Sequence, residues 1–336
     1  MSRSGIPVDH PEATVVPRAV DEQVLAPHDV ATGVVSDVAY LRTAIVNVVF
    51  LGEPGAGDRE WVLVDAGMPG YADRIAHAAE RRFGADSRPA AIVLTHGHFD
   101  HVGSLRELAE RWDAPIYAHE LELPYLTGRS AYPPPDPTVG GGLMARLSPL
   151  YPKGPWDFGD RVRTLPADGA VPGAPGWHWI ETPGHSPGHV SLFRAHDRAL
   201  VAGDAFVTTK QESALAALTQ RPEIHGPPMY FTPDWEQARV SVTRLSALGP
   251  TLAVTGHGLP MHGAELTAGL ATLAREFESL AVPRRGRYVG RPAVADASGV
   301  VSVPPPVPDP LPKILLGLGA AVAVGVLAAN VRRTRE

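Results

Sequence analysis

The chain has 336 residues, enough for one large domain or two ordinary ones, and 44% of them are hydrophobic, which is typical of a protein with a buried core. Its 30 basic and 36 acidic residues give a formal net charge of −6, which argues against a generally basic nucleic-acid-binding protein. The absence of cysteine excludes disulfides, thiolate metal sites and cysteine nucleophiles, so any metal must be bound by nitrogen and oxygen.

The first third of the chain predicts an alternation of strands and helices. Residues 1–36 contain no apolar run of signal-peptide length and are expected to form an irregular arm. Runs of β-branched residues are typical of strands, and an alanine-rich stretch studded with charges is typical of a helix. We expect strands over 40–51, 61–65 and 90–95, and helices over 71–83 and 102–111.

Residues 122–157 interrupt this pattern with eight prolines and five glycines. Such a stretch predicts a long excursion from the core, which either shapes an active site or forms a disordered surface insertion. Strand and helix patterns return after it. We expect strands over 177–181, 189–193, 199–202 and 251–255, and helices over 233–248 and 262–280.

The chain ends with two segments of unusual composition. Residues 284–312 predict a proline-rich linker, because seven of the 21 residues over 292–312 are proline and favour an extended spacer. Residues 313–336 predict a single transmembrane helix with a basic tail, because 314–331 are eighteen uncharged residues flanked by lysine and arginine. A buried helix of a soluble domain is the alternative.

The predicted anchor carries expectations about location and partners. It places the protein at a membrane, and without a signal peptide the rest of the chain is expected in the cytoplasm. The arginines after the helix argue against this orientation, because the positive-inside tendency would place them in the cytoplasm instead. Small residues recur at every fourth position of the helix, a stripe that could support a weak homodimer. The stripe consists of Gly317, Ala321, Gly325 and Ala329.

The sharpest motif follows the apolar run 91–94 and contains His96, His98, Asp100 and His101 within six residues. A strand that enters a loop holds its end rigid, so alternate residues 96 and 98 can point toward one ion. Asp100 and His101 can then serve a second ion. Imidazole and carboxylate suit zinc, iron or manganese, and sites without thiolate ligands leave the open positions that catalysis needs. A chance cluster of surface residues is the competing interpretation.

Three more candidate ligands occur downstream in similar settings. His185, Asp204 and His257 each follow a strand-like run and lie beside glycine. Glycine permits the tight turn that brings a side chain back over the edge of a sheet. Together with the first motif they make seven nitrogen and oxygen ligands, which is enough for two metal ions.

The order HxHxDH, His, Asp and His over residues 38–280 resembles the metallo-β-lactamase superfamily of metallo-hydrolases. The resemblance implies a four-layer α/β/β/α sandwich over 37–283, with the site at one edge of the sheets. It also implies a role for each ligand: His96, His98 and His185 bind the first metal, Asp100, His101 and His257 bind the second, and Asp204 bridges them. The absence of cysteine excludes the β-lactamase group that has a cysteine ligand, and His98 stands where flavodiiron oxidoreductases carry glutamate.

Other residues are expected to support the site. Asp65 matches the early aspartate of the family, which stands behind the ligands, and a turn-capping aspartate is nearly the same interpretation. His189 follows His185 by four residues and is expected to help by hydrogen bonding rather than as a ligand. Lys210 either contacts the substrate or is solvated. Four aromatic residues either line an apolar pocket or pack in the core: Tyr132, Trp156, Trp177 and Trp179.

These residues predict an enzyme that acts on a small molecule. Two divalent ions, Zn²⁺ with Fe or Mn as alternatives, would activate water against a thioester, lactone, ester or amide carbonyl, while Asp100 orients the water and relays its proton. One rival is a persulfide dioxygenase with a single iron at His96, His98 and His185. A nuclease is disfavoured by the net charge of −6. A non-catalytic, membrane-tethered protein would be expected to have lost some of the ligands.

Overall fold

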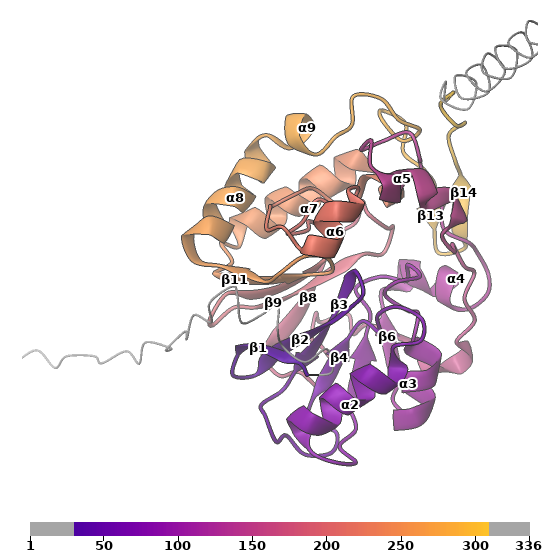
Figure 1. Cartoon of the computed structure of the whole chain (residues 1–336). Helices are drawn as coiled ribbons and strands as arrows, with labels where there is room; N and C mark the ends of the chain where they lie inside the picture. Colours follow the sequence, from indigo (N-terminus) through magenta and orange to yellow (C-terminus); the bar gives the residue numbers. More distant parts are fainter. Residues whose placement is uncertain (1–29, 309–336) are drawn as a thin grey trace, which may run out of the picture.

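The structure is a computed structural model that describes residues 30–308. Its strands form two main sheets, and helices cover the outer face of each sheet (Figure 1). The first sheet has seven strands in chain order: β1 (Thr32–Val35), β2 (Val38–Thr43), β3 (Val46–Leu51), β4 (Val62–Val64), β5 (Ala91–Val93), β6 (Ile116–Ala118) and β7 (Val162–Thr164). The second has the order β12 (Met261–His262), β11 (Leu252–Thr255), β10 (Ala199–Gly203), β9 (Val190–Arg194) and β8 (Trp177–Glu181).

Two features near the start of the chain differ from the sequence expectation. The predicted strand over 40–51 is a hairpin of β2 and β3, because Ala44 adopts a positive φ of 58° and reverses the chain. The strand β1 lies within the segment expected to be an irregular arm and pairs antiparallel with β2. Its TGVV sequence is too short for periodicity to reveal a strand. The strand forms because the free backbone edge of β2 supplies its hydrogen bonds.

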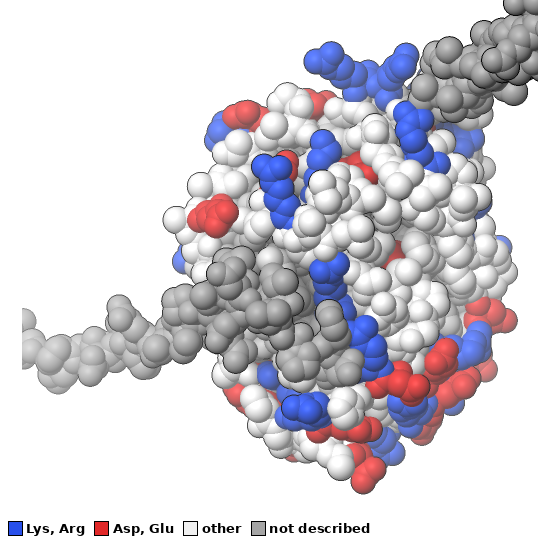
Figure 2. Space-filling view, in the orientation of Figure 1, with Lys and Arg blue, Asp and Glu red and all other residues white. Residues whose placement is uncertain are grey.

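The first helical layer comprises α2 (Ala72–Phe83) and α3 (Leu105–Trp112). On α2 the buried residues recur at helical spacing, so one apolar stripe faces the sheet. Trp61 fills the centre of this layer: it is fully buried, stacks on Phe83 with ring centroids 4.4 Å apart, and meets Trp112 edge-on at 5.5 Å. Around α2 and α3 the surface in Figure 2 shows basic and acidic side chains mixed together.

The strand β3 shows how the two sheets share one core. Val48 and Phe50 point to the helices, while Val49 and Leu51 point to the second sheet, as the period of two along a strand requires. Beyond the second sheet, α7 (Trp235–Ala247) and α8 (Gly263–Arg275) bury another apolar cluster. The layers are therefore helix, sheet, sheet and helix.

Parallel pairing of strands brings the loops that carry the candidate ligands to one edge of the sheets. Within the first sheet β4 pairs parallel with β5, and within the second β10 pairs parallel with β11. The carboxyl ends of parallel neighbours lie side by side, so the loops that follow these strands meet. These four loops carry most of the candidate ligands, which explains why residues far apart in sequence can form one site.

The excursion over 122–157 is ordered and packs near this edge. It contains α4 (Leu123–Leu126) and α5 (Leu143–Leu147), and Tyr125 within it is fully buried. The interpretation as a disordered insertion is therefore wrong. The remaining short helices are η1 (Glu120–Glu122), η2 (Ser148–Leu150), η3 (Gly159–Arg161), α6 (Ala214–Thr219), η4 (Met229–Phe231) and α9 (Phe277–Leu280).

The segment expected to be a proline-rich linker contains a hairpin of β13 (Val294–Asp296) and β14 (Gly299–Ser302). At its turn the Asp296 carboxylate accepts hydrogen bonds from the backbone N–H and the hydroxyl of Ser298. Upstream of the hairpin, Tyr288 packs into the core under α7 and α8. The prolines cluster after residue 303, so the β-branched residues before them are free to form strands.

The fold prediction is corrected at the C-terminus. Within residues 30–308 no helix is both long and apolar enough to cross a membrane, so the described fold has no counterpart of the predicted transmembrane helix. The segment 313–336, with its stripe of small residues, lies outside the described residues. The membrane location rested on that helix and is withdrawn with it, and so is the side of the membrane assigned to the rest of the chain.

Candidate metal centre

The seven ligands predicted from the sequence lie together at the common edge of the two sheets. The first motif follows β5, Asp204 follows β10, His257 follows β11, and His185 lies in the loop between β8 and β9. Each of the seven is at most 7% exposed. Their ligand atoms gather in three groups: His96, His98 and His185; His96, His101 and Asp204; and Asp100, His101 and His257.

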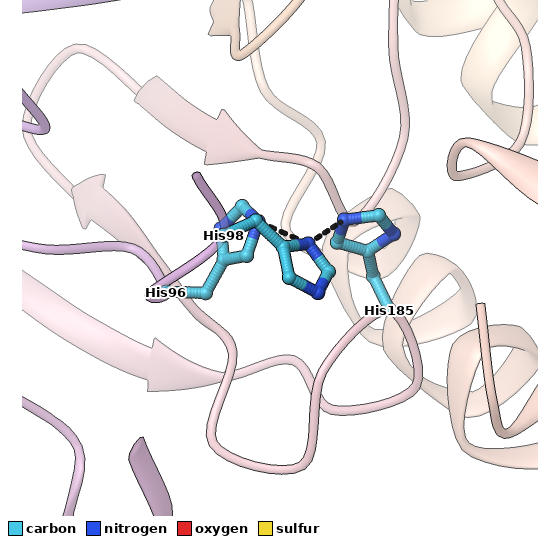
Figure 3. Close-up of side chains that lie close together, drawn as sticks. All are labelled: His96, His98 and His185. Carbon is cyan, nitrogen blue, oxygen red and sulfur yellow. Dashed lines mark hydrogen bonds between the residues drawn. The ribbon is translucent and has the colours of Figure 1, made fainter. Parts of the chain in front are cut away.

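The first group consists of three histidines that converge (Figure 3). The Nε2 atom of His96 lies 3.0 Å from Nδ1 of His98, which lies 2.9 Å from Nε2 of His185. Burial, reinforced by the neighbouring histidines, lowers the pKa of all three imidazoles, that of His98 to about 3. Neutral imidazoles keep the lone pairs that a metal ion needs.

The third group, Asp100, His101 and His257, adds a carboxylate, and Asp204 connects it with the first group. His257 Nε2 lies 3.1 Å from Asp204 Oδ2 and 3.5 Å from Asp100 Oδ2. The same Asp204 Oδ2 lies 3.4 Å from His185 Nε2, and Asp204 Oδ1 lies 3.6 Å from His101 Nε2. The Asp204 carboxylate therefore stands between the two groups. Burial would raise its pKa, but His257 and His101 hold that pKa well below its usual range, so the group is ionised.

Two atoms at the centre of the cluster make no hydrogen bond within the described residues. They are His101 Nε2 and Asp204 Oδ1, and both are buried. A buried polar atom left unpaired costs about 1–3 kcal/mol, which a divalent cation placed between such atoms would remove. The donor set of imidazole nitrogen and carboxylate oxygen is also one that divalent metals prefer. The residues present therefore fit a divalent metal.

Hydrogen bonds behind the ligands fix which nitrogen faces the site. Asp65, held at a φ of 61°, accepts the backbone N–H of Thr95 at 2.8 Å and Nδ1–H of His101 at 2.7 Å. His257 Nδ1 lies 2.7 Å from the carbonyl of Ile45, which can only accept, so Nδ1 carries a proton. Burial alone would lower the pKa of His101, but the carboxylates of Asp65 and Asp204 outweigh this effect and raise that pKa well above its ordinary value. In both imidazoles Nε2 is thus turned toward the carboxylates.

His189 has both ring nitrogens occupied by the protein. Its Nε2 accepts the backbone N–H of Asp204 at 2.9 Å, so its Nδ1 carries the proton toward the hydroxyl of Thr182 at 2.8 Å. No nitrogen is left for a metal ion. This geometry makes His189 a residue that positions the Asp204 loop.

Comparison with known proteins places this geometry in a family. Residues 41–257, about two thirds of the chain, match the family model described as the metallo-beta-lactamase superfamily. The chain belongs to this superfamily. The resemblance inferred from the HxHxDH, His, Asp, His order is therefore confirmed.

Curated relatives agree on the class of enzyme. The chain is 48% identical over 240 residues to the "Probable metallo-hydrolase YflN" of Bacillus subtilis (strain 168), an alignment that covers 71% of this chain and 90% of that protein. It is 33% identical to the "Probable metallo-hydrolase YybB" of the same organism, over 58% of this chain and 74% of that protein. The chain is a metallo-hydrolase of the metallo-beta-lactamase superfamily.

Solved structures share the fold. A beta-lactamase domain protein from Burkholderia ambifaria superposes with a TM-score of 0.51 at 20% identity, covering 81% of this chain and 80% of that one. A B3 metallo-beta-lactamase with an active-site glutamic acid also gives 0.51 at 20% identity, over 80% of this chain and 96% of that one. At this identity the likeness concerns the fold alone.

The aromatic residues divide between the two roles considered for them. Tyr132 stands beside the site, its ring 4.6 Å from that of His98. Trp156 donates its indole N–H to the carbonyl of Gly97 at 2.9 Å. Trp177 and Trp179 pack in the core between the sheets instead. For Lys210 no contact of the side chain with the cluster is found among residues 30–308, so its role in substrate binding stays a prediction.

Sequence reasoning missed Glu122, which is fully buried behind the ligand loops. Its carboxylate accepts hydrogen bonds from the backbone N–H of Gly97 at 3.0 Å and of Gly188 at 2.8 Å, and from the hydroxyls of Ser186 and Tyr132. The two loops it joins carry all three histidines of the first group. No sequence signal singled it out, since it lies in a short helical turn four residues after β6.

We expect Gly256→Ala to weaken metal binding while leaving the fold intact. A Cβ atom at this position would lie 2.0 Å from Asp204 Oδ1 and 2.9 Å from His101 Cε1, so the carboxylate must move. Zinc affinity, measured by competition with a chelator, should fall at least about 10-fold, as it does when ligand orientation is disturbed. Gly33→Ala, where a Cβ meets nothing within 4 Å, is the matched control. Wild-type zinc affinity in Gly256→Ala would contradict the prediction.

Proposed function

We propose that this metallo-hydrolase uses two zinc ions to direct water at the carbonyl carbon of a thioester, lactone, ester or amide. The observation that carries the proposal is the position of Asp204. Its Oδ2 atom lies 3.4 Å from His185 Nε2 and 3.1 Å from His257 Nε2, so one carboxylate faces both ligand groups. A carboxylate in this position could serve a pair of metal ions.

The proposed roles follow the two groups. His96, His98 and His185 would hold one ion, Asp100, His101 and His257 the other, and Asp204 both. Nitrogen and oxygen ligands without thiolate suit zinc, and iron or manganese would also be accepted. When bound, such ions polarise a carbonyl oxygen and lower the pKa of water toward neutrality.

The side chains supply the remaining requirements of hydrolysis. The Asp100 carboxylate lies 3.5 Å from His257 Nε2 and would accept a hydrogen bond from the attacking water and pass its proton to the leaving group. Asp65 and the carbonyl of Ile45 hold the rings of His101 and His257 in fixed orientations. Tyr132 and Phe231 flank the ring of His98 at 4.6 and 4.7 Å and exclude bulk water from that side.

The test combines metal analysis with a substrate panel. Full-length chain purified without added metal is analysed for zinc, iron and manganese and then assayed with thioester, lactone, ester, amide and phosphodiester substrates. We expect two zinc ions per chain and hydrolysis of a carbonyl substrate. One iron per chain with oxygen uptake would instead identify the dioxygenase, and cleavage of the phosphodiester alone would identify a nuclease.

We further expect His98→Ala to reduce hydrolysis to the level of metal-stripped chain, with zinc below two ions per chain. The imidazole of His98 is the central member of the first group, within 3.0 Å of both other histidines. His196→Ala removes a histidine that is 72% exposed and should behave as wild type. Full activity in His98→Ala would refute the assignment of this residue.

A further inference from the structure

The seven candidate ligands are not equally shielded from solvent. Asp100 is 7% and His98 is 5% exposed, whereas none of the other five exceeds 2%. The ring of His98 is covered by Tyr132 and Phe231, which leaves Asp100 as the ligand nearest to solvent. Phe99 stands between the two ligands in the chain and is half-buried. A substrate that reaches the centre from solvent therefore passes Phe99.

Phe99 belongs to an apolar cluster beside this approach, which we call the Phe99 cluster. Its ring centroid lies 5.4 Å from that of Tyr151. The ring of Tyr151 in turn lies 6.2 Å from that of Phe231, which is 4.7 Å from the imidazole of His98. Phe99, Tyr151 and Met144 are half-buried, so they present apolar surface to solvent while they pack on the buried members of the cluster. The buried members are Val139, Ala145, Tyr230 and Phe231.

Local contacts hold the ring of Tyr151 in this cluster. Its backbone N–H donates to the carbonyl of Ser148 at 3.0 Å, and its hydroxyl oxygen lies 3.7 Å from Sδ of Met144 on α5. Burial raises the pKa of its phenol, and the Asp100 carboxylate raises that pKa further. The ring therefore lies within the electrostatic field of the carboxylate to which the proton transfer is assigned.

The excursion carries further apolar surface next to this cluster. Three of the nine large apolar side chains that are exposed within residues 30–308 lie on α5 and η2, and they are Leu143, Leu147 and Leu150. In the chain Leu143 adjoins Met144, and Leu150 adjoins Tyr151. Apolar side chains that are exposed together usually mark a binding surface. Because this surface is continuous with the rings beside Asp100, its expected occupant is an apolar part of the substrate.

Asp100 decides which part of the substrate meets this surface. In the proposed mechanism its carboxylate passes a proton to the leaving atom, so the leaving group lies on the Asp100 side of the carbonyl carbon. Phe99 adjoins Asp100 in the chain, and Tyr151 lies within its field. An aliphatic leaving group would therefore rest on these two rings and gain free energy with each methylene group that leaves water.

We propose that the Phe99 cluster binds an aliphatic leaving group, and that Phe99 and Tyr151 make esters or thioesters of medium-chain alcohols or thiols the preferred substrates. The inference rests on the proposed function and names its substrate class. In the reaction water adds to the carbonyl carbon, and the bond to the leaving sulfur or oxygen breaks. The proton that Asp100 takes from the water ends on that sulfur or oxygen, so the products are a carboxylic acid and the free thiol or alcohol.

The test varies the leaving group and keeps the acyl group constant. Zinc-loaded full-length chain is assayed with S-ethyl, S-hexyl and S-2-(2-hydroxyethoxy)ethyl thioacetate, or with the matching acetate esters if thioesters are not cleaved. We expect kcat/KM for the hexyl compound to exceed that for the ethyl compound by about 10-fold, because the added methylene groups rest on one apolar face and are partly removed from water. The hydroxyethoxyethyl chain is as long as hexyl but polar, so it should gain little over ethyl.

Variants of Tyr151 make the test specific. Tyr151→Ser removes the ring and should lower the hexyl-to-ethyl ratio of kcat/KM at least about 3-fold. Tyr151→Phe keeps the ring, loses only the hydroxyl and should retain the ratio. Tyr71→Ser changes a half-buried tyrosine that packs on the first helical layer instead, and as the matched control it should leave the ratio unchanged.

The outcomes separate this inference from the proposed function. A hexyl-to-ethyl ratio near one, or an unchanged ratio in a folded Tyr151→Ser variant, would overturn the assignment of the Phe99 cluster while leaving the hydrolase intact. A ratio near one together with a dimer that dissociates in Tyr151→Ser would place a second copy of the chain on this surface instead. Cleavage of lactones or amides alone would overturn only the inference, whereas failure to cleave any carbonyl substrate would overturn the proposed function as well. If Tyr151→Ser does not fold, Met144→Ser takes its place with the same expectation.

Discussion

On the proposed two-metal function, replacing Asp204 by alanine should leave at most one metal ion per chain and abolish hydrolysis. Its carboxylate is the one that faces both ligand groups, with Oδ2 3.4 Å from His185 and 3.1 Å from His257. Residues that merely orient ligands typically contribute 10–100-fold to metal affinity, so loss of a shared ligand should cost well over 100-fold. Zinc affinity is measured by chelator competition and stoichiometry by elemental analysis.

Asp204→Asn refines this prediction. The amide keeps the size of the side chain and one neutral oxygen but loses the charge that His257 and His101 stabilise. We expect it to fold as the wild type and to retain one ion weakly. Asp160→Ala, which removes an exposed carboxylate before β7, is the control. Two tightly bound ions in Asp204→Ala would show that the two groups do not share this ligand.

The candidate ligands could be found from sequence because each lies at the end of a strand. His96 and His98 follow a buried apolar run, and Asp204 and His257 each stand beside a glycine after such a run. Apolar runs and glycine are local signals, and parallel pairing of the strands does the rest by bringing their ends to one edge. The local sequence therefore indicated the ligand types and the strand ends that carry them, and parallel pairing explains why those ends converge.

Local sequence could not predict which polar residues are buried. Glu120 and Glu122 lie two positions apart in one short helical turn, yet Glu120 is exposed and Glu122 is fully buried. Nothing in the sequence distinguishes them, because the donors that surround Glu122 come from Gly97, Ser186 and Gly188. Only the folded arrangement of distant loops decides which carboxylate is part of the site.

The prediction for the C-terminal segment 284–312 differs from the structure for another reason. Averaging over 292–312 emphasised its prolines and hid the short β-branched runs of β13 and β14. Tyr288 likewise gave no sign of its place in the core, where its hydroxyl donates to the carbonyl of Pro134, 154 residues earlier in the chain. Composition describes a segment as a whole, whereas a hairpin or a buried contact depends on a few positions within it.

Glu122→Ala is the second substitution for which we expect a large effect, on both stability and metal binding. It leaves three buried donors without an acceptor, the N–H of Gly188 and the hydroxyls of Ser186 and Tyr132, while the N–H of Gly97 keeps only the hydroxyl oxygen of Tyr132. Each buried donor left without a partner costs about 1–3 kcal/mol of folding free energy. Because Gly97 separates His96 from His98, and Ser186 follows His185, the first ligand group should also lose about 10–100-fold in zinc affinity.

Glu122→Gln separates positioning of the loops from simple filling of space. Its amide oxygen can still accept from Ser186 and Gly188, but its NH₂ group would face the N–H of Gly97, whose remaining acceptor is then the hydroxyl oxygen of Tyr132. We therefore expect intermediate stability and intermediate zinc affinity, measured by thermal unfolding of the metal-free chain and by chelator competition. Glu120→Ala, in the same short helix but exposed, should match the wild type in both. If Glu122→Gln and Glu122→Ala bind zinc as tightly as the wild type, the carboxylate serves packing alone and the two loops hold their histidines without it.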